Sequence, residues 1–526
     1  MKKILLICFS LAMFWSLTSC VDDLDTEPKI EQTLEQLLAE DPSAIEGILS
    51  RLYASFALSG PNGPGSSDIS DDAGESPFLR GIVNLQDFTA DAMKNRWGDD
   101  GLDQLTTISQ WTSSNKFFRY LYNRIYYTVP QCNNLLNVLE SASVSTPESI
   151  KSEVRFLRSL AYFYLIDAFG RGVLATDENF GTSEFLPEAS RQQLFNYVED
   201  ELLDIESTIG NNNGYGRANT FVVDMLLSKL YLNAEVYTGT ARYSDAATYL
   251  TKIINEGGYS LEPNFIKNFS GDNNESLEII YPLIADPINS QSYGNTTYIV
   301  NGSLSPDTFK EFNPDTGQDE PILYKFGAQE GWQGHRSTSA WYGLYGDLAT
   351  STDVRASLFW TQGHNYIMTD YREWTDGYPS TKFRNNDLND TPSSGISFSG
   401  TDFPLYRLSD VYLMFAECAV RGASNASMSD ALNYVNMVRN RASASTITMA
   451  DLDLDFIIDE RGRELNLEGH RRTDLIRFGR FTGGSYLWPW KGNTAGGASI
   501  PDAYNLFPIP QSALDANPNL QQNTGY

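Results

Sequence analysis

Two separated stretches of this 526-residue chain carry the same helical-hairpin pattern, and that repetition narrows the folds open to it. A tetratricopeptide unit is two antiparallel helices over about 34 residues, with small side chains where the helices touch. In residues 227–254 the matching positions are Leu230, Ala234, Tyr237, Tyr243, Ala246 and Leu250. In residues 413–438 they are Ala416, Cys418, Ala431 and Val435. Both copies together predict a mostly α fold with a tetratricopeptide-like helical-repeat scaffold.

Three further helices are predicted from apolar residues that recur every three or four positions, over residues 32–56, 113–140 and 147–169. In the last of these, Thr146 is a plausible N-cap. Pro147 would then occupy the first helical position, where its missing N–H costs nothing.

Residues 261–404 have a different character, rich in Gly, Asn, Asp, Ser and Thr with scattered aromatics and no long helical period. Such a stretch predicts a large irregular insertion with short strands and helices, and ordered loops of that size usually carry function. The C-terminal residues 483–526 are similar, because their prolines block a long helix. We expect one domain, residues 20–526, with this insertion as its loop-rich binding region.

Residues 1–19 have the layout of a secretory signal, with Lys2 and Lys3, then about a dozen mostly apolar residues, then small residues before Cys20. The junction resembles a bacterial lipobox, in which the cysteine is acylated and anchors the mature protein. An ordinary signal peptide followed by an incidental cysteine is the alternative. Cys8 lies within the signal segment, and the other two cysteines, Cys132 and Cys418, lie in helical patterns. Two buried free thiols are favoured, and a disulfide between them stays open.

The charge is strongly acidic, with 67 Asp and Glu against 38 Lys and Arg and a formal net charge of −29. Nucleic acid and anionic lipid both require a basic surface, so neither is expected as a partner. Zinc-hydrolase HExxH and esterase GxSxG patterns do not occur in the sequence. Carboxylate pairs are too common here to indicate a glycosidase.

Two charged segments invite a functional interpretation. Charges alternate in sign along a predicted helix, at Glu460, Arg461, Arg463, Glu464, Glu468, Arg471 and Arg472. An anion site is one interpretation; pairing within the helix plus a few buried arginine contacts is favoured. Residues 272–276 lack the spacing of a calcium loop and are interpreted as a turn. No cofactor is expected, and a structural calcium ion is left open.

Several segments together resemble the SusD-like (RagB/SusD) family of Bacteroidetes outer-membrane lipoproteins. They are "VRFLRSLAYFYLIDAFGRGVL", "NNESLEIIY", "FPLYRLSDVYLMFAECAVRG", "ALNYVNMVRNRA", "IIDERGRELNLEGHRRTDLIRFGRF" and "FPIPQSALDANPNLQQNTGY". The match covers nearly the whole mature chain, departing at "GRGVLAT", where the family more often has a Gly-Val-Pro turn. The aspartates of residues 22–25 likewise resemble the tag that sends such lipoproteins to the outer face of the outer membrane.

The resemblance implies four tetratricopeptide-like units, no enzymatic activity, and a location on the outer face of the outer membrane through a lipid on Cys20. It also implies a function: binding oligosaccharide and delivering it to a SusC-like TonB-dependent transporter. Open alternatives are a SusD-like binder of another glycan or of peptides, and a surface glycoside hydrolase.

A pyranose offers an apolar C–H face and a rim of hydroxyls, so its site needs flat rings and hydrogen-bonding groups. Candidate rings in loop-rich segments are Trp97, Tyr293, Tyr298, Trp332, Trp341 and Tyr342. The spacing of Arg80, Trp97 and Asp100 is similar to that in starch-binding members of the family, where the third residue is an amide. With Trp332 and either Tyr298 or Tyr293 from the insertion, these residues predict an arc of rings suited to an α-1,4-glucan.

Overall fold

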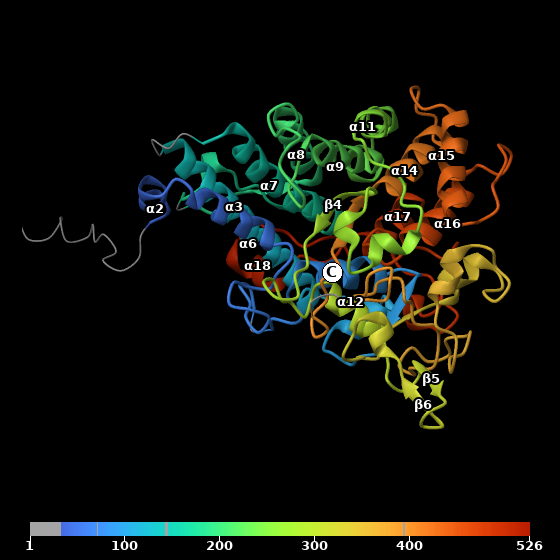
Figure 1. Cartoon of the computed structure of the whole chain (residues 1–526). Coiled ribbons are helices and arrows are strands. Elements are labelled where there is room, and N and C mark those ends of the chain that lie inside the picture. Colours follow the sequence, from blue (N-terminus) through green and yellow to red (C-terminus); the bar gives the residue numbers. More distant parts are fainter. Residues whose placement is uncertain (1–32, 71, 142–145, 183, 393–394) are drawn as a thin grey trace, which may run out of the picture.

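Long helices packed in sequence order form the scaffold of the computed structural model, which describes residues 33–70, 72–141, 146–182, 184–392 and 395–526. The long scaffold helices are α6 (Lys116–Ser141), α7 (Glu148–Ala168), α8 (Arg191–Ile205), α9 (Thr220–Leu232), α11 (Tyr243–Glu256), α14 (Leu408–Val420), α15 (Met428–Arg441) and α16 (Leu454–Leu465). Helix α7 packs on α6 and α8, α9 on α11, α11 on α14, and α14 on α15 and α16. Several of these helices cross the upper part of Figure 1 as one row.

The two predicted hairpins are the pairs α9–α11 and α14–α15. Ala234, Ala246, Ala416 and Ala431 are all fully buried, because only a small side chain lets two helix backbones approach closely there. The short helix α10 (Ala234–Thr238) continues the first arm beyond Asn233. The mostly α, helical-repeat fold predicted from the sequence is confirmed.

The predicted helix over residues 32–56 is two helices, α2 (Leu34–Glu40) and α3 (Ala44–Ala54). Pro42 lies between them and cannot donate the hydrogen bond that a continuous helix requires. Pro147 also differs from the prediction, because it has extended dihedral angles and takes the N-cap position itself. The helical segments were therefore predicted correctly, and the errors concern where helices begin and end.

The other elements are short and connect the scaffold to the loops. The helices are α4 (Phe78–Ile82), a π-helical turn η1 (Val83–Phe88), α5 (Leu102–Thr107), α12 (Thr296–Ser303), α13 (Ser339–Tyr342), α17 (Arg471–Arg477) and α18 (Gln511–Ala516). The 3₁₀ turns are η2 (Asp177–Asn179), η3 (Phe265–Phe269), η4 (Asn273–Glu275), η5 (Leu323–Phe326), η6 (Gly343–Tyr345), η7 (Val354–Leu358), η8 (Lys491–Asn493) and η9 (Asp502–Asn505).

Strands pair antiparallel in twos: β1 (Met93–Asn95) with β7 (His335–Ser337), β2 (Arg171–Val173) with β3 (Glu188–Ser190), β4 (Ile279–Leu283) with β8 (Phe403–Arg407), and β5 (Lys310–Asn313) with β6 (Gln318–Pro321). Strands β4 to β8 all fall within or at the end of residues 261–404, as short elements separated by loops. Figure 1 shows α12 and the β5–β6 hairpin on the opposite side of the molecule from α11 and α15.

The alternating charges of α16 and α17 form a buried ion-pair network. Glu464 is fully buried and pairs with Arg355 at 2.7 Å and Arg407 at 2.7 Å, both from distant segments. The pair Arg463–Glu460 is a contact within the helix, at 2.9 Å. Buried arginine contacts between segments thus outweigh pairing along the helix, and they fix the insertion against the helical scaffold.

Cys132 and Cys418 are both free and fully buried, as predicted. No helix within the described ranges combines the length and the apolar composition needed to cross a membrane. The signal segment, Cys20 and the aspartates of residues 22–25 lie outside the described residues.

Candidate functional site

Pairing of β1 with β7 explains why Trp97 and Trp332 lie together. The strands run antiparallel with Asn95 opposite His335, so the residues that follow β1 meet the residues that precede β7. The Arg96 N–H donates to the Gly334 carbonyl at 3.1 Å and extends the pairing. The two indole centroids are 6.5 Å apart, with their planes at 52°.

Gly334 permits this close approach. A Cβ atom at that position would lie 2.5 Å from the Trp97 ring, which is closer than real Cβ contacts come. The Trp97 Nε1–H donates to the Trp332 carbonyl at 3.0 Å, and the Trp332 Nε1–H donates to Glu330 at 3.1 Å. Both polar ring atoms are thereby satisfied and both indoles are partly exposed, so apolar ring surface faces solvent.

Arg80 is held beneath the indoles by π-systems and carboxylates. Its guanidinium lies 4.4 Å from the Tyr298 ring centroid and 5.8 Å from that of Trp97. Its carboxylate partners, Glu75 and Asp99, are 3.7 and 3.6 Å away. Burial raises the pKa of the Glu75 carboxyl above its ordinary value, although hydrogen bonding and charge from neighbouring cations oppose that shift.

Arg80 retains hydrogen-bonding capacity toward a ligand. It donates from Nη1 to the Gly74 carbonyl at 3.1 Å, while its buried Nε has no hydrogen-bond partner among the residues that the structure describes. Arg80 is only 8% exposed, so it can reach a ligand only through the part of its guanidinium that faces the indole pair.

Tyr298 and His335 form the floor under Trp97. Tyr298 is 0% exposed, and its hydroxyl donates to Asn84 Oδ1 at 2.7 Å. The His335 ring is 4.6 Å from Tyr298 and 5.4 Å from Trp97, measured between centroids. Burial, with the nearby positive charges of Arg80 and Arg336, lowers the pKa of His335 well below its ordinary value, so the ring is neutral.

The other candidate residues for sugar binding fall into two groups, those with exposed side chains and those with buried ones. Tyr293 is 44% exposed and packs beside Phe398, with centroids 5.0 Å apart. Asp100 is exposed in the turn that follows Trp97. Trp341 and Tyr342 are 1% and 0% exposed, packed in the core, so their candidacy as open rings was wrong.

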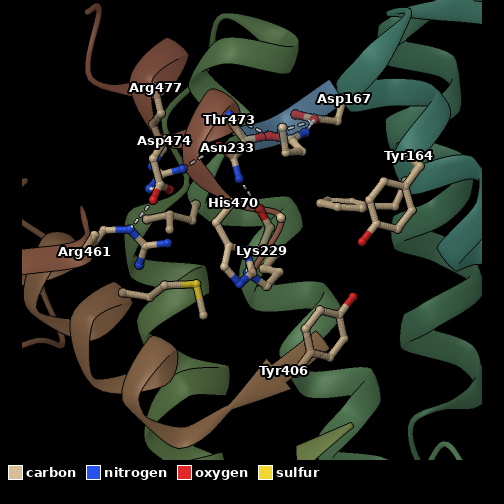
Figure 2. Close-up of a pocket in the computed structure, with 15 residues that line it drawn as sticks. Tyr164, Asp167, Lys229, Asn233, Tyr406, Arg461, His470, Thr473, Asp474 and Arg477 are labelled. Carbon is tan, nitrogen blue, oxygen red and sulfur yellow. Dashed lines mark hydrogen bonds and ion pairs between the residues drawn. The ribbon is translucent and has the colours of Figure 1, made fainter. Parts of the chain in front are cut away.

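Figure 2 shows a different pocket, enclosed among charged side chains of the scaffold. Lys229, His470 and Tyr406 face a cavity of about 30 Å³, which holds a water molecule or two but no sugar ring. Lys229 pairs with Asp410 at 2.6 Å, and burial lowers the pKa of His470 to about 3. The lining is therefore part of the buried network.

Within the described ranges, no three His, Cys, Asp or Glu side chains come together as a metal site. In the segment considered for calcium, Asp272 pairs with Lys267 at 2.5 Å and Asn273–Glu275 form a 3₁₀ turn.

A helical-repeat scaffold that carries a partly exposed pair of indoles on its loops is the architecture of a ligand-binding protein. The model of the SusD family matches residues 257–526. The starch-binding protein SusD of Bacteroides thetaiotaomicron is 32% identical over an alignment of 563 positions, which covers 97% of this chain and 96% of that protein. The chain belongs to the SusD family, and the resemblance found in the sequence is confirmed.

Other relatives are more distant. A SusD-like protein of Bacteroides ovatus is 23% identical, over 76% of this chain and 72% of its own length. Solved structures of SusD superfamily and surface glycan-binding proteins share the fold. A SusD superfamily protein of Bacteroides vulgatus has a TM-score of 0.69 at 20% identity, over 92% of this chain and 99% of that one. Surface glycan-binding protein A of B. thetaiotaomicron, in complex with laminarihexaose, has a TM-score of 0.67 at 21% identity. The match covers 91% of this chain and 99% of that one.

Proposed function

We propose that this chain is a non-enzymatic, lipid-anchored protein of the cell surface that binds starch or maltooligosaccharide and passes it to a SusC-like TonB-dependent transporter. The observation that carries the proposal is the pair of partly exposed indoles, Trp97 and Trp332, with centroids 6.5 Å apart and planes inclined at 52°. Flat ring faces complement the C–H faces of pyranoses. Two inclined faces suit consecutive units of a curved chain such as an α-1,4-glucan.

Polar groups beside the indoles supply the hydroxyl contacts. The Arg80 guanidinium lies 5.8 Å from the Trp97 ring centroid, and Asp100 is an exposed acceptor three residues beyond Trp97. Tyr293 is our choice for the third ring, because Tyr298 is fully buried. Tyr298 then contributes by supporting Arg80 and Trp97 from below.

Starch is favoured over other glycans by the similarity to the starch-binding protein of B. thetaiotaomicron across nearly the whole chain. The structural neighbour holding laminarihexaose shows that proteins of this fold also bind β-glucans, so the substrate needs a direct test.

Calorimetry against a glycan panel provides that test. Maltoheptaose, laminarihexaose, and inulin, mannan, xylan and pectin fragments are titrated into wild type, Trp97→Ala and the control Tyr324→Ala, which removes a ring 64% exposed elsewhere in the insertion. We expect wild type and control to bind maltoheptaose and Trp97→Ala to lose most of that affinity. An isotherm unchanged in Trp97→Ala contradicts the site, and selective binding of another glycan contradicts the choice of starch.

The proposed membrane anchor is based on the family resemblance and on Cys20. The proposed transporter partner is based on the family resemblance. Gentle detergent extraction of the full chain from its native cells, followed by affinity purification and mass spectrometry, tests the transporter. Co-purification of a TonB-dependent transporter supports the proposal, and its absence under conditions that retain other outer-membrane complexes contradicts it.

A further inference from the structure

A cavity separate from the indole pair is bounded by α3, by the loop that precedes α9, and by β4 with the turn that follows it. Its volume is about 330 Å³, within the roughly 300–1,000 Å³ that is usual for small-ligand sites. Its lining includes neither indole, neither residue of the floor beneath Trp97, and neither Arg80 nor Tyr293. A molecule in this cavity would therefore be bound at a different place from one that lies on the indoles.

The lining of this cavity combines flat rings with aliphatic surface. Tyr53 from α3, Tyr215 from the loop and Tyr281 from β4 each contribute a ring, and Tyr215 is the most open of them at 48% exposed. The aliphatic part comes from Leu49, Ala54, Ala57, Leu58, Leu283 and Ile284. Such surfaces complement the apolar C–H groups of a ligand.

Hydrogen bonds and close packing hold the exposed ring of Tyr215 in place. Its hydroxyl donates to Asp402 Oδ2 at 2.7 Å, and Asp402 Oδ1 accepts from the Ala285 N–H at 2.7 Å. A Cβ atom on Gly216 would lie 2.8 Å from Ile284 Cδ1, so glycine allows the loop to pack closely on the end of β4. The loop and the strand are thereby tied together, and the cavity is preformed.

The two charged residues of the lining neutralise each other. Among the described residues that line the cavity, only Glu46 and Arg217 are charged, and Arg217 Nη1 donates to Glu46 Oε2 at 3.0 Å. Arg217 also donates to the buried carboxylate of Glu153, from Nε at 2.8 Å and from Nη2 at 2.5 Å. A guanidinium shared by two carboxylates has no positive charge to spare for an anion, and the formal charge of −29 repels one further. The lining therefore favours an uncharged ligand.

Hydroxyl groups in the lining remain able to bond a ligand. The Ser50 hydroxyl donates to the Glu46 carbonyl at 2.7 Å, and its oxygen can still accept, as can that of Tyr215. The Ser290 hydroxyl can both donate and accept. An acyl chain would cover these groups without giving them hydrogen bonds, which costs free energy. A saccharide meets both requirements, because it is uncharged and has apolar faces with a rim of hydroxyls.

We propose that this cavity is a second, independent binding site for a neutral saccharide, with Tyr215 as its stacking ring and with Ser50 and Ser290 contacting hydroxyls. The inference goes beyond the proposed function, which requires only the indole pair. One exposed ring offers less stacking surface than two indoles, so the second site binds more weakly. Two sites on one chain can also engage a long polysaccharide together, which raises its apparent affinity.

Saturation-transfer NMR tests the second site, because it detects sugar that is bound too weakly for calorimetry. Maltotriose and laminaritriose are the probes, and Trp97→Ala is the background that removes the indole pair. In that background we compare Tyr215→Ala, which deletes the ring, Ala54→Met, which fills the cavity from α3, and the control Tyr324→Ala.

We expect Trp97→Ala to keep saturation transfer to at least one trisaccharide. Adding Tyr215→Ala or Ala54→Met should weaken this residual binding by about 3- to 10-fold, the scale of one aromatic contact, while adding Tyr324→Ala should not. Tyr215→Ala alone should leave calorimetric binding at the indole pair unchanged. Circular dichroism melts show whether each variant is folded, and Ala54→Met carries the test if Tyr215→Ala does not fold.

The results that overturn the second site differ from those that overturn the function. Residual binding that is equal in the cavity variants and the control overturns the inference alone. Complete loss of saturation transfer in Trp97→Ala, when wild type binds, also overturns it and leaves the proposed function intact. Wild type that binds neither trisaccharide overturns both.

Discussion

Glu464→Gln tests the buried ion-pair network most sharply. The Glu464 carboxylate is fully buried and pairs with Arg355, Arg407 and Arg441. The substitution keeps the shape of the side chain but removes its negative charge. Three buried guanidinium groups then have one carboxylate fewer to balance their positive charge. Removing one partner of a buried pair costs roughly 3–5 kcal/mol.

That cost converts into a measurable shift of the melting temperature. With an unfolding entropy of ~2.1 cal/mol/K per residue, about 500 residues unfolding as one unit have ~1.1 kcal/mol/K. A loss of ~3–5 kcal/mol then lowers Tm by about 3–5 °C. The matched control is Glu311→Gln, since the Glu311–Lys325 pair is 50% and 42% exposed and should contribute only ~0–1 kcal/mol.

Acid provides a second measurement on the same variant. The surrounding arginines lower the pKa of Glu464 in the folded state, so its stabilisation is present above the unfolded pKa of ~4.3 and is lost as the pH falls below it. Differential scanning calorimetry should show wild-type Tm falling from about pH 5 to pH 3, and falling less steeply in Glu464→Gln. A Tm for Glu464→Gln no lower than that of Glu311→Gln at pH 7 would refute the reasoning.

Three further outcomes are expected. Tyr298→Phe removes the hydroxyl that donates to the buried side-chain oxygen of Asn84, so chemical denaturation should show a loss of ~1–3 kcal/mol in stability. The affinity for glucan should stay unchanged. A variant that keeps its stability but loses affinity would instead make Tyr298 a direct contact. Burial raises the pKa of the Cys132 thiol to about 12 and also raises that of Cys418. Neither thiol should therefore react with a disulfide reagent until the chain is unfolded. Rapid labelling of the native protein would contradict this expectation. Cys20→Ala should release the protein from the membrane fraction and abolish fatty-acid labelling, and retention of the lipid would place the anchor elsewhere.

Much of the scaffold was predictable because helix packing leaves a local signature. Ala234, Ala246 and Ala416 lie at positions where only small side chains fit, and that requirement is visible as spacing in the sequence. Helix ends were less predictable, since Asp41 and Pro42 interrupt an otherwise continuous apolar pattern.

The candidate site was predictable in part. Sequence identified Trp97 and Trp332 as loop rings, but their proximity depends on the pairing of β1 with β7, between segments more than 200 residues apart. Exposure was not predictable either, because Tyr298 and Trp341 come from the same loop-rich insertion as Tyr293 and yet are buried.

Phe398 was missed. Its surroundings, "SGISFSG", signal a loop carrying a single ring, but nothing local indicates that this ring packs on Tyr293. Long-range contacts of this kind require the fold.

A crystal structure of the protein soaked with maltoheptaose tests the central claim most directly. The account predicts pyranose rings stacked on the exposed faces of Trp97 and Trp332, about 4 Å from the indole planes, with the chain continuing toward Tyr293. Sugar bound at another surface while both indoles remain bare would contradict it.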